Sequence, residues 1–225
     1  MTFSIVARCA RTGQFGVAVS SSSPAVAARC PYARAGVGAV STQNVTDPTL
    51  GPQALDLLAL GASAEQAIAV IRQGGPALAH RQVLVVDRAG GTAIHSGARV
   101  LGRWAQAQGP NAACAGNLLA SASVPDAMLA AFQRDTSAPL AARLLAAMQA
   151  ALDAGGEEGP VHSAGLKIVD QVAWPVADLR VDWTDSCPIA GLRDLWALYA
   201  PQLDAYVTRA LDPDAAPKYG VPGDL

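Results

Sequence analysis

The first residues of the chain set the strongest constraint on its fold. Phe3, Ile5 and Ala7 alternate with Ser4 and Val6, and this period of two predicts a β-strand that is buried on at least one face. Chain ends are usually frayed unless they are tied into the structure. A core strand that starts at the second residue therefore places the amino terminus inside a sheet.

Thr2 stands directly behind the initiator methionine, and methionine aminopeptidases generally remove Met before a small residue. Removal of Met1 is expected to leave Thr2 with a free α-amine beside its own hydroxyl. A nucleophile and a base within one residue are a known way to activate a weak hydroxyl group. We therefore predict that Thr2 is a catalytic nucleophile, although a Met-Thr start on its own is common.

Composition and charge exclude several classes of protein. Charged residues make up 15% of the 225 residues and the formal net charge is −2, so there is no basic patch for a nucleic acid or an anionic membrane. No apolar stretch approaches the roughly 20 residues of a membrane span, and the first residues do not resemble a signal peptide. We expect a cytoplasmic protein. The four cysteines and three histidines show no metal-ligand spacing, so no metal and no cofactor are predicted.

The order of the predicted elements indicates the fold class. Strands are expected over residues 2–8, 14–20 and 36–43, followed by two helices, the second of which begins at a capping box formed by Ser63 and Gln66. The second half repeats this order, with strands over 81–87, 92–96 and 111–116, two helices after Ser123 and Ser137, and a last core strand over 163–169. Two antiparallel sheets stacked face to face, with helices outside, satisfy this order.

The carboxy-terminal part has a different composition. Trp183, Trp196, Tyr199 and Tyr206 lie here, and apolar residues keep a helical spacing across Pro201 before a proline-rich arm. We predict a main domain over residues 1–181 and a helical and extended tail over 182–225. Because Trp and Tyr are enriched in interface cores, the tail is expected to contribute to a homo-oligomer. The alternative is a tail that folds back on its own chain.

A set of short motifs spread along the chain resembles a known family. The motifs are TFSIVA at residues 2–7, GVGAVSTQNVTDPTLG at 36–51, RQV at 81–83, GNLL at 116–119 and SA at 163–164. Together they resemble a bacterial family of unknown function that is assigned to the N-terminal nucleophile (Ntn) hydrolase superfamily. The resemblance extends to about residue 181. It implies an α+β fold, a four-layer αββα sandwich, and amide-bond chemistry at an N-terminal Thr, Ser or Cys.

The resemblance also suggests which groups stabilise the oxyanion of such a reaction. By analogy with proteasome-type members, Gly51 at a helix start would offer a backbone N–H. Asn117 is the predicted side-chain donor, and a helix-capping role for Asn117 is the alternative. Proteasome-like members carry a lysine that tunes the nucleophile, whereas this chain has only Lys167 and Lys218, neither of which lies on an early strand.

The substrate-binding residues are predicted from their positions at strand ends. Gln43 and Asn44 end a strand beside the proposed site and could hold an amide or a carboxylate. Ser20 and Ser22 lie across from them if the first two strands form a hairpin. His162 precedes a core strand and could reach the mouth of the pocket.

Three hypotheses from different classes follow. The leading one is an Ntn-type amidohydrolase that uses Thr2 to cleave a C–N bond of a small amide, ureido or N-acyl amino compound. The second is a non-catalytic small-molecule-binding or assembly module on the same fold. The third is a serine hydrolase that uses the Ser20–Ser23 loop with His95 or His162, although no Asp completes a Ser–His–Asp set.

Overall fold

The computed structural model of the protein describes residues 2–221. Its strands are β1 (Thr2–Arg8), β2 (Phe15–Ser21), β3 (Pro31–Arg34), β4 (Gly38–Asn44), β5 (Arg81–Asp87), β6 (Thr92–Ser96), β7 (Ala105–Gly109), β8 (Ala112–Asn117), β9 (Ser163–Val169) and β10 (Ala177–Val181). Its α-helices are α1 (Leu50–Ala59), α2 (Ala64–Ile71), α3 (Val124–Arg134), α4 (Leu140–Asp153), α5 (Pro188–Tyr199) and α6 (Leu203–Leu211).

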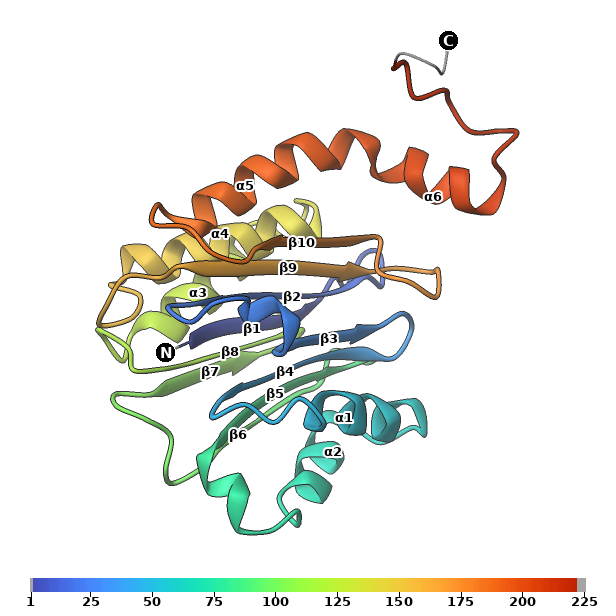
Figure 1. The fold of residues 1–225 in the computed structure, drawn as a ribbon. Coiled ribbons are helices and arrows are strands. Elements are labelled where there is room, and N and C mark those ends of the chain that lie inside the picture. The colour runs from blue at the N-terminus through green and yellow to red at the C-terminus, as the bar shows by residue number, and fades with distance from the viewer. Residues whose placement is uncertain (1, 222–225) are drawn as a thin grey trace.

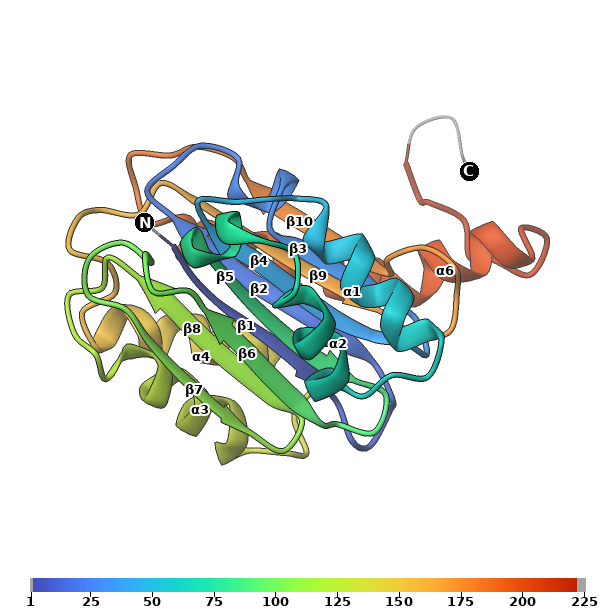
Figure 2. The ribbon, with the colours of Figure 1, turned by 90° about the horizontal axis from the view of Figure 1, so that it is seen from below.

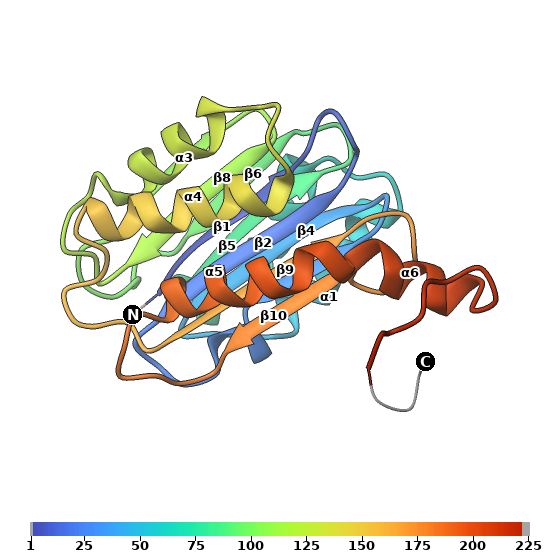
Figure 3. The ribbon, with the colours of Figure 1, turned by 90° about the horizontal axis from the view of Figure 1, so that it is seen from above.

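These elements form four layers (Figure 1). One sheet has the strand order β10-β9-β2-β1-β8-β7 and the other has the order β3-β4-β5-β6, and every pairing is antiparallel. Helices α1 and α2 cover the outer face of the four-stranded sheet (Figure 2). Helices α3, α4 and α5 cover the outer face of the six-stranded sheet (Figure 3). The predicted αββα sandwich is therefore confirmed.

Strand β1 lies in the middle of the six-stranded sheet, between β2 and β8. Phe3, Ile5 and Ala7 belong to the apolar core under α3 and α4, whereas Val6 belongs to the core between the two sheets. Successive side chains of a strand point to opposite faces. Thr2 and Ser4 therefore face the space between the sheets together with Val6.

Local sequence signals explain several of the boundaries. Ser63 accepts a hydrogen bond from the backbone N–H of Gln66, and the Gln66 side chain accepts one from Ser63, so the predicted capping box opens α2. Gly38 begins β4, and a Cβ on it would lie 2.5 Å from the Val86 carbonyl oxygen. Its lack of a side chain is thus required by the close approach of β5.

The sequence analysis missed β3, β7 and β10. All three are edge strands. An edge strand is short and covered on fewer sides, so its apolar pattern is weaker than that of a central strand. The segment AQAQG of β7, for example, alternates small and polar residues.

The tail begins inside the subunit's own core. Ile189 and Leu192 of α5 are fully buried in the cluster that also contains Phe3 and Leu144. Helix α5 ends at Tyr199, a 3-10 turn over Ala200–Gln202 contains Pro201, and α6 follows without a buried residue. The domain boundary after residue 181 and the homo-oligomer remain predictions. Within residues 2–221, no helix combines the length and the apolar character needed to cross a membrane.

Substitution of Leu192 should test how much α5 contributes to stability. Leu192→Ala removes a fully buried side chain and is expected to lower the free energy of unfolding by about 2–5 kcal/mol. Leu198, which is 70% exposed on the same helix, provides the control, because Leu198→Ala should change this energy by less than about 0.5 kcal/mol. Urea unfolding of both variants measures the difference. Equal effects would show that α5 does not belong to the core.

Candidate functional site

The space between the sheets is apolar at one end and polar at the other. Val6 packs there against Val17 of β2 and against Ala39 and Leu84 of the second sheet. Toward the start of β1 the inward-facing positions carry hydroxyl and amide side chains, namely Thr2, Ser4, Ser21, Ser41, Gln43, Gln82 and Asn117, all of which are buried. Polar groups are costly to bury unless they are hydrogen-bonded. Their concentration at one end therefore marks a candidate functional site.

Side-chain hydrogen bonds link the two sheets at this end. Ser4 donates to Gln43 Oε1 over 2.6 Å, and Gln43 Nε2 donates to Gln82 Oε1 over 2.7 Å. Asn117 Nδ2 donates to the same Gln82 oxygen over 3.3 Å. The four side chains are at most 1% exposed. They form a continuous chain of hydrogen bonds from β1 through β4 and β5 to β8.

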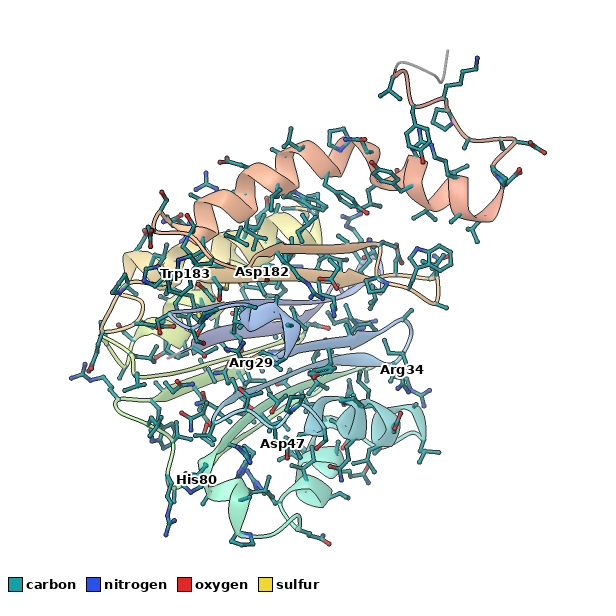
Figure 4. The ribbon with its side chains drawn as sticks, viewed as in Figure 1. Arg29, Arg34, Asp47, His80, Asp182 and Trp183 are labelled. Carbon is teal, nitrogen blue, oxygen red and sulfur yellow. The ribbon has the colours of Figure 1, made fainter. Side chains whose placement is uncertain are left out.

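Thr2 lies next to Asn117, the last of these four hydrogen-bonded side chains. It is 5% exposed and directly opposite Asn117 in the register of β1 and β8. Its hydroxyl donates to Ser21 Oγ over 3.3 Å, and Ser21 Oγ lies 2.8 Å from Ser23 Oγ. Arg29 Nη2 donates to Ser23 Oγ over 2.7 Å. Arg29, labelled in Figure 4, follows the short 3-10 turn that joins β2 to β3.

Glu157 supplies a buried carboxylate at the same end. It is 5% exposed, its Oε2 accepts a hydrogen bond from the Ser22 backbone N–H over 3.3 Å, and its backbone forms a bridge with Leu119. Ser22 follows β2 and Leu119 follows β8, the two strands that flank β1. Glu157 therefore spans the end of β1 at Thr2. Burial raises the pKa of Glu157 to about 7, against the opposing effect of the Ser22 hydrogen bond.

Three buried side-chain atoms around this site lack a hydrogen-bond partner among the described residues. They are Ser41 Oγ, Asn117 Oδ1 and Glu157 Oε1. A buried polar atom without a partner typically costs about 1–3 kcal/mol. The site thus has hydrogen-bonding capacity that residues 2–221 do not use.

The structure brings Asn117 to Thr2, as the sequence analysis expected, but not as a helix cap. Asn117 is the last residue of β8, and the next helix begins at Val124 with Ser123 as its N-cap. The capping alternative is therefore wrong. Leu118 adopts a positive φ of 51°, a conformation that is costly for a branched side chain and typical of functional sites.

Two of the predicted residues lie away from this group. Gly51 is the second residue of α1 and packs on the outer face of the four-stranded sheet, where a Cβ would lie 2.2 Å from the Tyr32 ring. Ser20 pairs with Phe3 and so faces the helices, and its hydroxyl donates to the Ser163 carbonyl oxygen over 2.9 Å. Neither is placed beside Thr2, and their predicted roles remain untested.

The other predicted substrate residues surround the site without all being open to a ligand. Gln43 is fully buried in the chain of hydrogen bonds. The Asn44 side chain donates to the His80 carbonyl oxygen and accepts from the Leu101 N–H. Ser22 is partly exposed and adjoins Glu157. Their binding roles remain predictions.

His162 lies at the same end of the molecule. Its backbone N–H donates to the Ser21 carbonyl oxygen, and its ring Nδ1 lies 2.8 Å from the Thr184 carbonyl oxygen. The ring stacks on Trp183 at a centroid distance of 4.3 Å, and Figure 4 shows Trp183 at the amino-terminal end of the sandwich. His162 thus tethers the segment after β10 to the rim of the site.

Gln82 and Glu157 were not predicted from the sequence, and Ser21 was included only within the Ser20–Ser23 loop of the third hypothesis. Ser21 and Gln82 could have been identified, because Ser21 continues the inward series of Val17 and Val19, and Gln82 is a polar residue directly before the four apolar residues of its strand. Glu157 gives no such signal, since it follows Gly155-Gly156 in a loop and reaches the site through tertiary structure.

The fold and the site define a class of protein: a four-layer αββα sandwich whose central strand begins with a buried hydroxyl residue. The chain belongs to DUF1028, a family of unknown function, whose model matches residues 2–192. The sequence motifs predicted membership of a family of unknown function, and the match confirms this part of the prediction. No functionally curated protein matches the chain.

A solved structure of the same family agrees with this assignment. A crystal structure of a DUF1028 protein from Silicibacter pomeroyi is 27% identical, with a TM-score of 0.82 and coverage of 88% of this chain and 89% of that chain. Anbu (ancestral beta-subunit) from Yersinia bercovieri aligns over 90% of this chain and 96% of its own, but with 10% identity and a TM-score of 0.38. The second similarity is too low to support a conclusion.

The raised pKa of Glu157 predicts a pH-dependent stability. In the folded chain the Glu157 carboxyl group stays protonated up to about pH 7, whereas an ordinary Glu, as in the unfolded chain, loses its proton near pH 4.5. The free energy of unfolding therefore falls as the pH rises between these two values. Glu157→Gln keeps the shape without the charge. In protein that retains Met1, and so has no Thr2 α-amine beside the carboxylate, the free energy of unfolding of this variant should exceed that of the wild type by a margin that grows between pH 4.5 and 7 and reaches about 3 kcal/mol at about pH 8.

The adjacent Glu158 is the matched control for this measurement. Its side chain is 54% exposed, so Glu158→Gln removes the same charge from a solvated position and should stay within about 0.5 kcal/mol of the wild type throughout. Urea unfolding at several pH values gives both curves. A difference between Glu157→Gln and wild type that is constant with pH would contradict the assignment.

Proposed function

We propose that this protein is an amidohydrolase of the Ntn type, in which Thr2 becomes the first residue by loss of Met1 and acts as the nucleophile. The substrate class is a small amide, ureido or N-acyl amino compound, and the protein acts in the cytoplasm. The observation that carries the proposal is the position of Thr2. Its hydroxyl lies at the start of the central strand, where Thr2 pairs with Asn117, and the Asn117 Oδ1 and Glu157 Oε1 atoms at this end have no hydrogen-bond partner among the described residues.

The proposed reaction uses the two functional groups of a terminal Thr2. The neutral α-amine, with a reference pKa of about 7.7–8.0, takes the hydroxyl proton while Oγ1 attacks the carbonyl carbon of the substrate. The tetrahedral intermediate collapses by breaking the C–N bond, and the ammonium group gives its proton to the leaving nitrogen. Water then attacks the ester formed on Thr2 and releases the acid, which restores the free hydroxyl.

Asn117 is the proposed donor to the oxyanion. Its Nδ2 uses one hydrogen on Gln82, and an amide nitrogen carries two. Because Gln82 is itself held by Gln43, Ser96 and the Gly116 carbonyl, Asn117 is fixed before the substrate arrives. Such preorganisation is the usual basis of oxyanion stabilisation.

Glu157 is proposed to hold the α-amine. The carboxylate spans the end of β1 between Ser22 and Leu119, where the amine of a terminal Thr2 would lie. One carboxylate oxygen accepts the hydrogen bond from Ser22, and the other has no hydrogen-bond partner among residues 2–221. A cation beside that free oxygen would satisfy it and would favour the charged carboxylate.

The two alternative hypotheses receive less support. A serine hydrolase needs a base within hydrogen-bond reach of the serine, but the ring contacts of His95 and His162 among the described residues are with the Leu78 and Thr184 carbonyl oxygens and include no serine hydroxyl. A non-catalytic binding module would explain the unpartnered polar atoms equally well. Covalent labelling of Thr2 distinguishes such a binding module from an enzyme.

The activated ester p-nitrophenyl acetate provides a test of the nucleophile. Native chain, checked by intact mass for loss of one methionine residue, should release a burst of nitrophenol and carry an acetyl group on Thr2. Thr2→Ala should abolish the burst, and Thr2→Ser should retain part of it because the hydroxyl and amine remain. Thr42→Ala is the control, since the Thr42 hydroxyl bonds the Asp47 carbonyl away from the site. A full burst in Thr2→Ala would refute the mechanism.

Substitution of Asn117 should test the oxyanion donor once a turned-over amide is found. Asn117→Ala is expected to lower kcat by roughly 10²–10³ with little change in KM, because the donor acts mainly in the transition state. Melting temperature, measured in parallel, detects the loss of the Gln82 hydrogen bond. Intact turnover with a lowered melting temperature would restrict Asn117 to a structural role.

A further inference from the structure

A concave region lies at the end of the six-stranded sheet opposite to Thr2. The cavity has a volume of about 660 Å³, and three arginines line it together with Asn111, Gln133 and Ser137. Arg8 is the last residue of β1, Arg11 lies in the turn to β2, and Arg143 is in the first turn of α4. Arg8 is separated from Thr2 by the length of β1, roughly 20 Å for an extended strand of this size.

The three guanidinium groups are held in place by uncharged oxygen atoms. Arg8 Nη1 donates to Asn111 Oδ1 over 3.2 Å, and Arg11 Nη2 donates to the Ser137 carbonyl oxygen over 3.3 Å. Arg143 Nε donates to the Phe132 carbonyl oxygen over 3.0 Å, and its guanidinium lies 3.9 Å from the centre of the Phe132 ring. Arginine has five N–H donors, so these bonds position each group and use only part of its donors, with Arg143 also hydrogen-bonded to the Cys9 thiol.

The three arginines have no directly paired carboxylate in the part of the chain that the structure describes. Among residues 2–221, no carboxylate forms an ion pair with Arg8, Arg11 or Arg143. Arg143 is 6% exposed, and a buried charge without a counterion is costly. The nearby Asp135 does act on Arg143, but it is solvent-exposed, it accepts hydrogen bonds from Ser137 and Ala138, and it does not line the cavity.

The thiol of Cys9 is a neighbour of Arg143. It is buried in the apolar core. Burial acts to raise its pKa, yet hydrogen bonds from Thr12 and Arg11 and the charge of Arg143 bring that pKa below its usual value. The hydrogen bonds contribute more to this lowering of the pKa than the charge of Arg143 does.

We propose that this arginine cavity binds a small organic anion that carries at least two acidic groups. Guanidinium groups pair with carboxylate and phosphate in a bidentate geometry, and three of them from β1, the following turn and α4 surround one space. Its volume falls in the range of small-molecule sites, about 300–1,000 Å³. The site is independent of the proposed chemistry at Thr2.

Isothermal titration calorimetry of the full chain with inorganic pyrophosphate and with citrate, at constant ionic strength, tests this site. At least one probe should bind saturably with a Kd of about 1 mM or lower, and the preferred probe distinguishes a phosphate ligand from a carboxylate ligand. Arg8→Gln and Arg11→Gln should each weaken binding at least tenfold. Arg143→Lys keeps the charge and should also weaken it, because the bidentate geometry is lost.

Arg34→Gln is the matched control. It removes the same charge from β3, where Arg34 pairs with Asp56 over 2.8 Å, and Figure 4 shows it at the end of the sandwich remote from the N-terminus. Its effect should be less than twofold. The proposal is overturned if neither probe binds up to roughly 10 mM, if Arg34→Gln weakens binding as much as Arg11→Gln, or if only a polymeric anion such as heparin binds. The decisive variants are those of the exposed Arg11 and the strand-end Arg8, so the test does not depend on whether Arg143→Lys folds.

Discussion

The two sheets are joined at one end by side-chain hydrogen bonds instead of apolar contacts, and the site depends on this junction. Ser4, Gln43, Gln82 and Asn117 form the connection. Each of these side chains is buried, so replacing any one of them by an apolar residue would leave a buried donor or acceptor of its neighbour without a hydrogen bond. The apolar end of the same interface provides the packing energy, while the polar end fixes the spacing and the orientation of Thr2 and Asn117. A purely apolar interface would bring the sheets together without specifying where the amide of Asn117 points.

Much of the fold could be predicted because its central strands carry strong patterns. Residues 2–8 and 81–87 were predicted with the bounds that the structure gives to β1 and β5. The strands that were missed lie at sheet edges, where burial on fewer sides leaves a weaker pattern. The site was predicted less well. Ser20 was chosen where the alternation of β2 places Ser21 inward, and a shift of one residue reverses the face of a strand.

Tertiary structure accounts for the remaining differences. Glu157 follows two glycines in a loop, and only the packing of that loop against β2 and β8 brings its carboxylate to the end of β1. Gly51 has the predicted place at a helix start, yet the helix covers the outer face of the second sheet. Local sequence identifies residue types that are suited to chemistry. It does not specify which side of a layer they occupy once the sheets are stacked.

The central position of β1 has a practical consequence for protein production. Any residues added before Thr2 must leave the sheet between Ser22 and Leu119 and pass the Glu157 carboxylate. Under the proposed mechanism, an amino-terminal affinity tag would prevent exposure of the α-amine. Helix α6 has no buried residue, so a tag beyond it leaves both sheets undisturbed. Under the same mechanism, an amino-terminally tagged sample that fails in an activity screen gives no information on the processed chain.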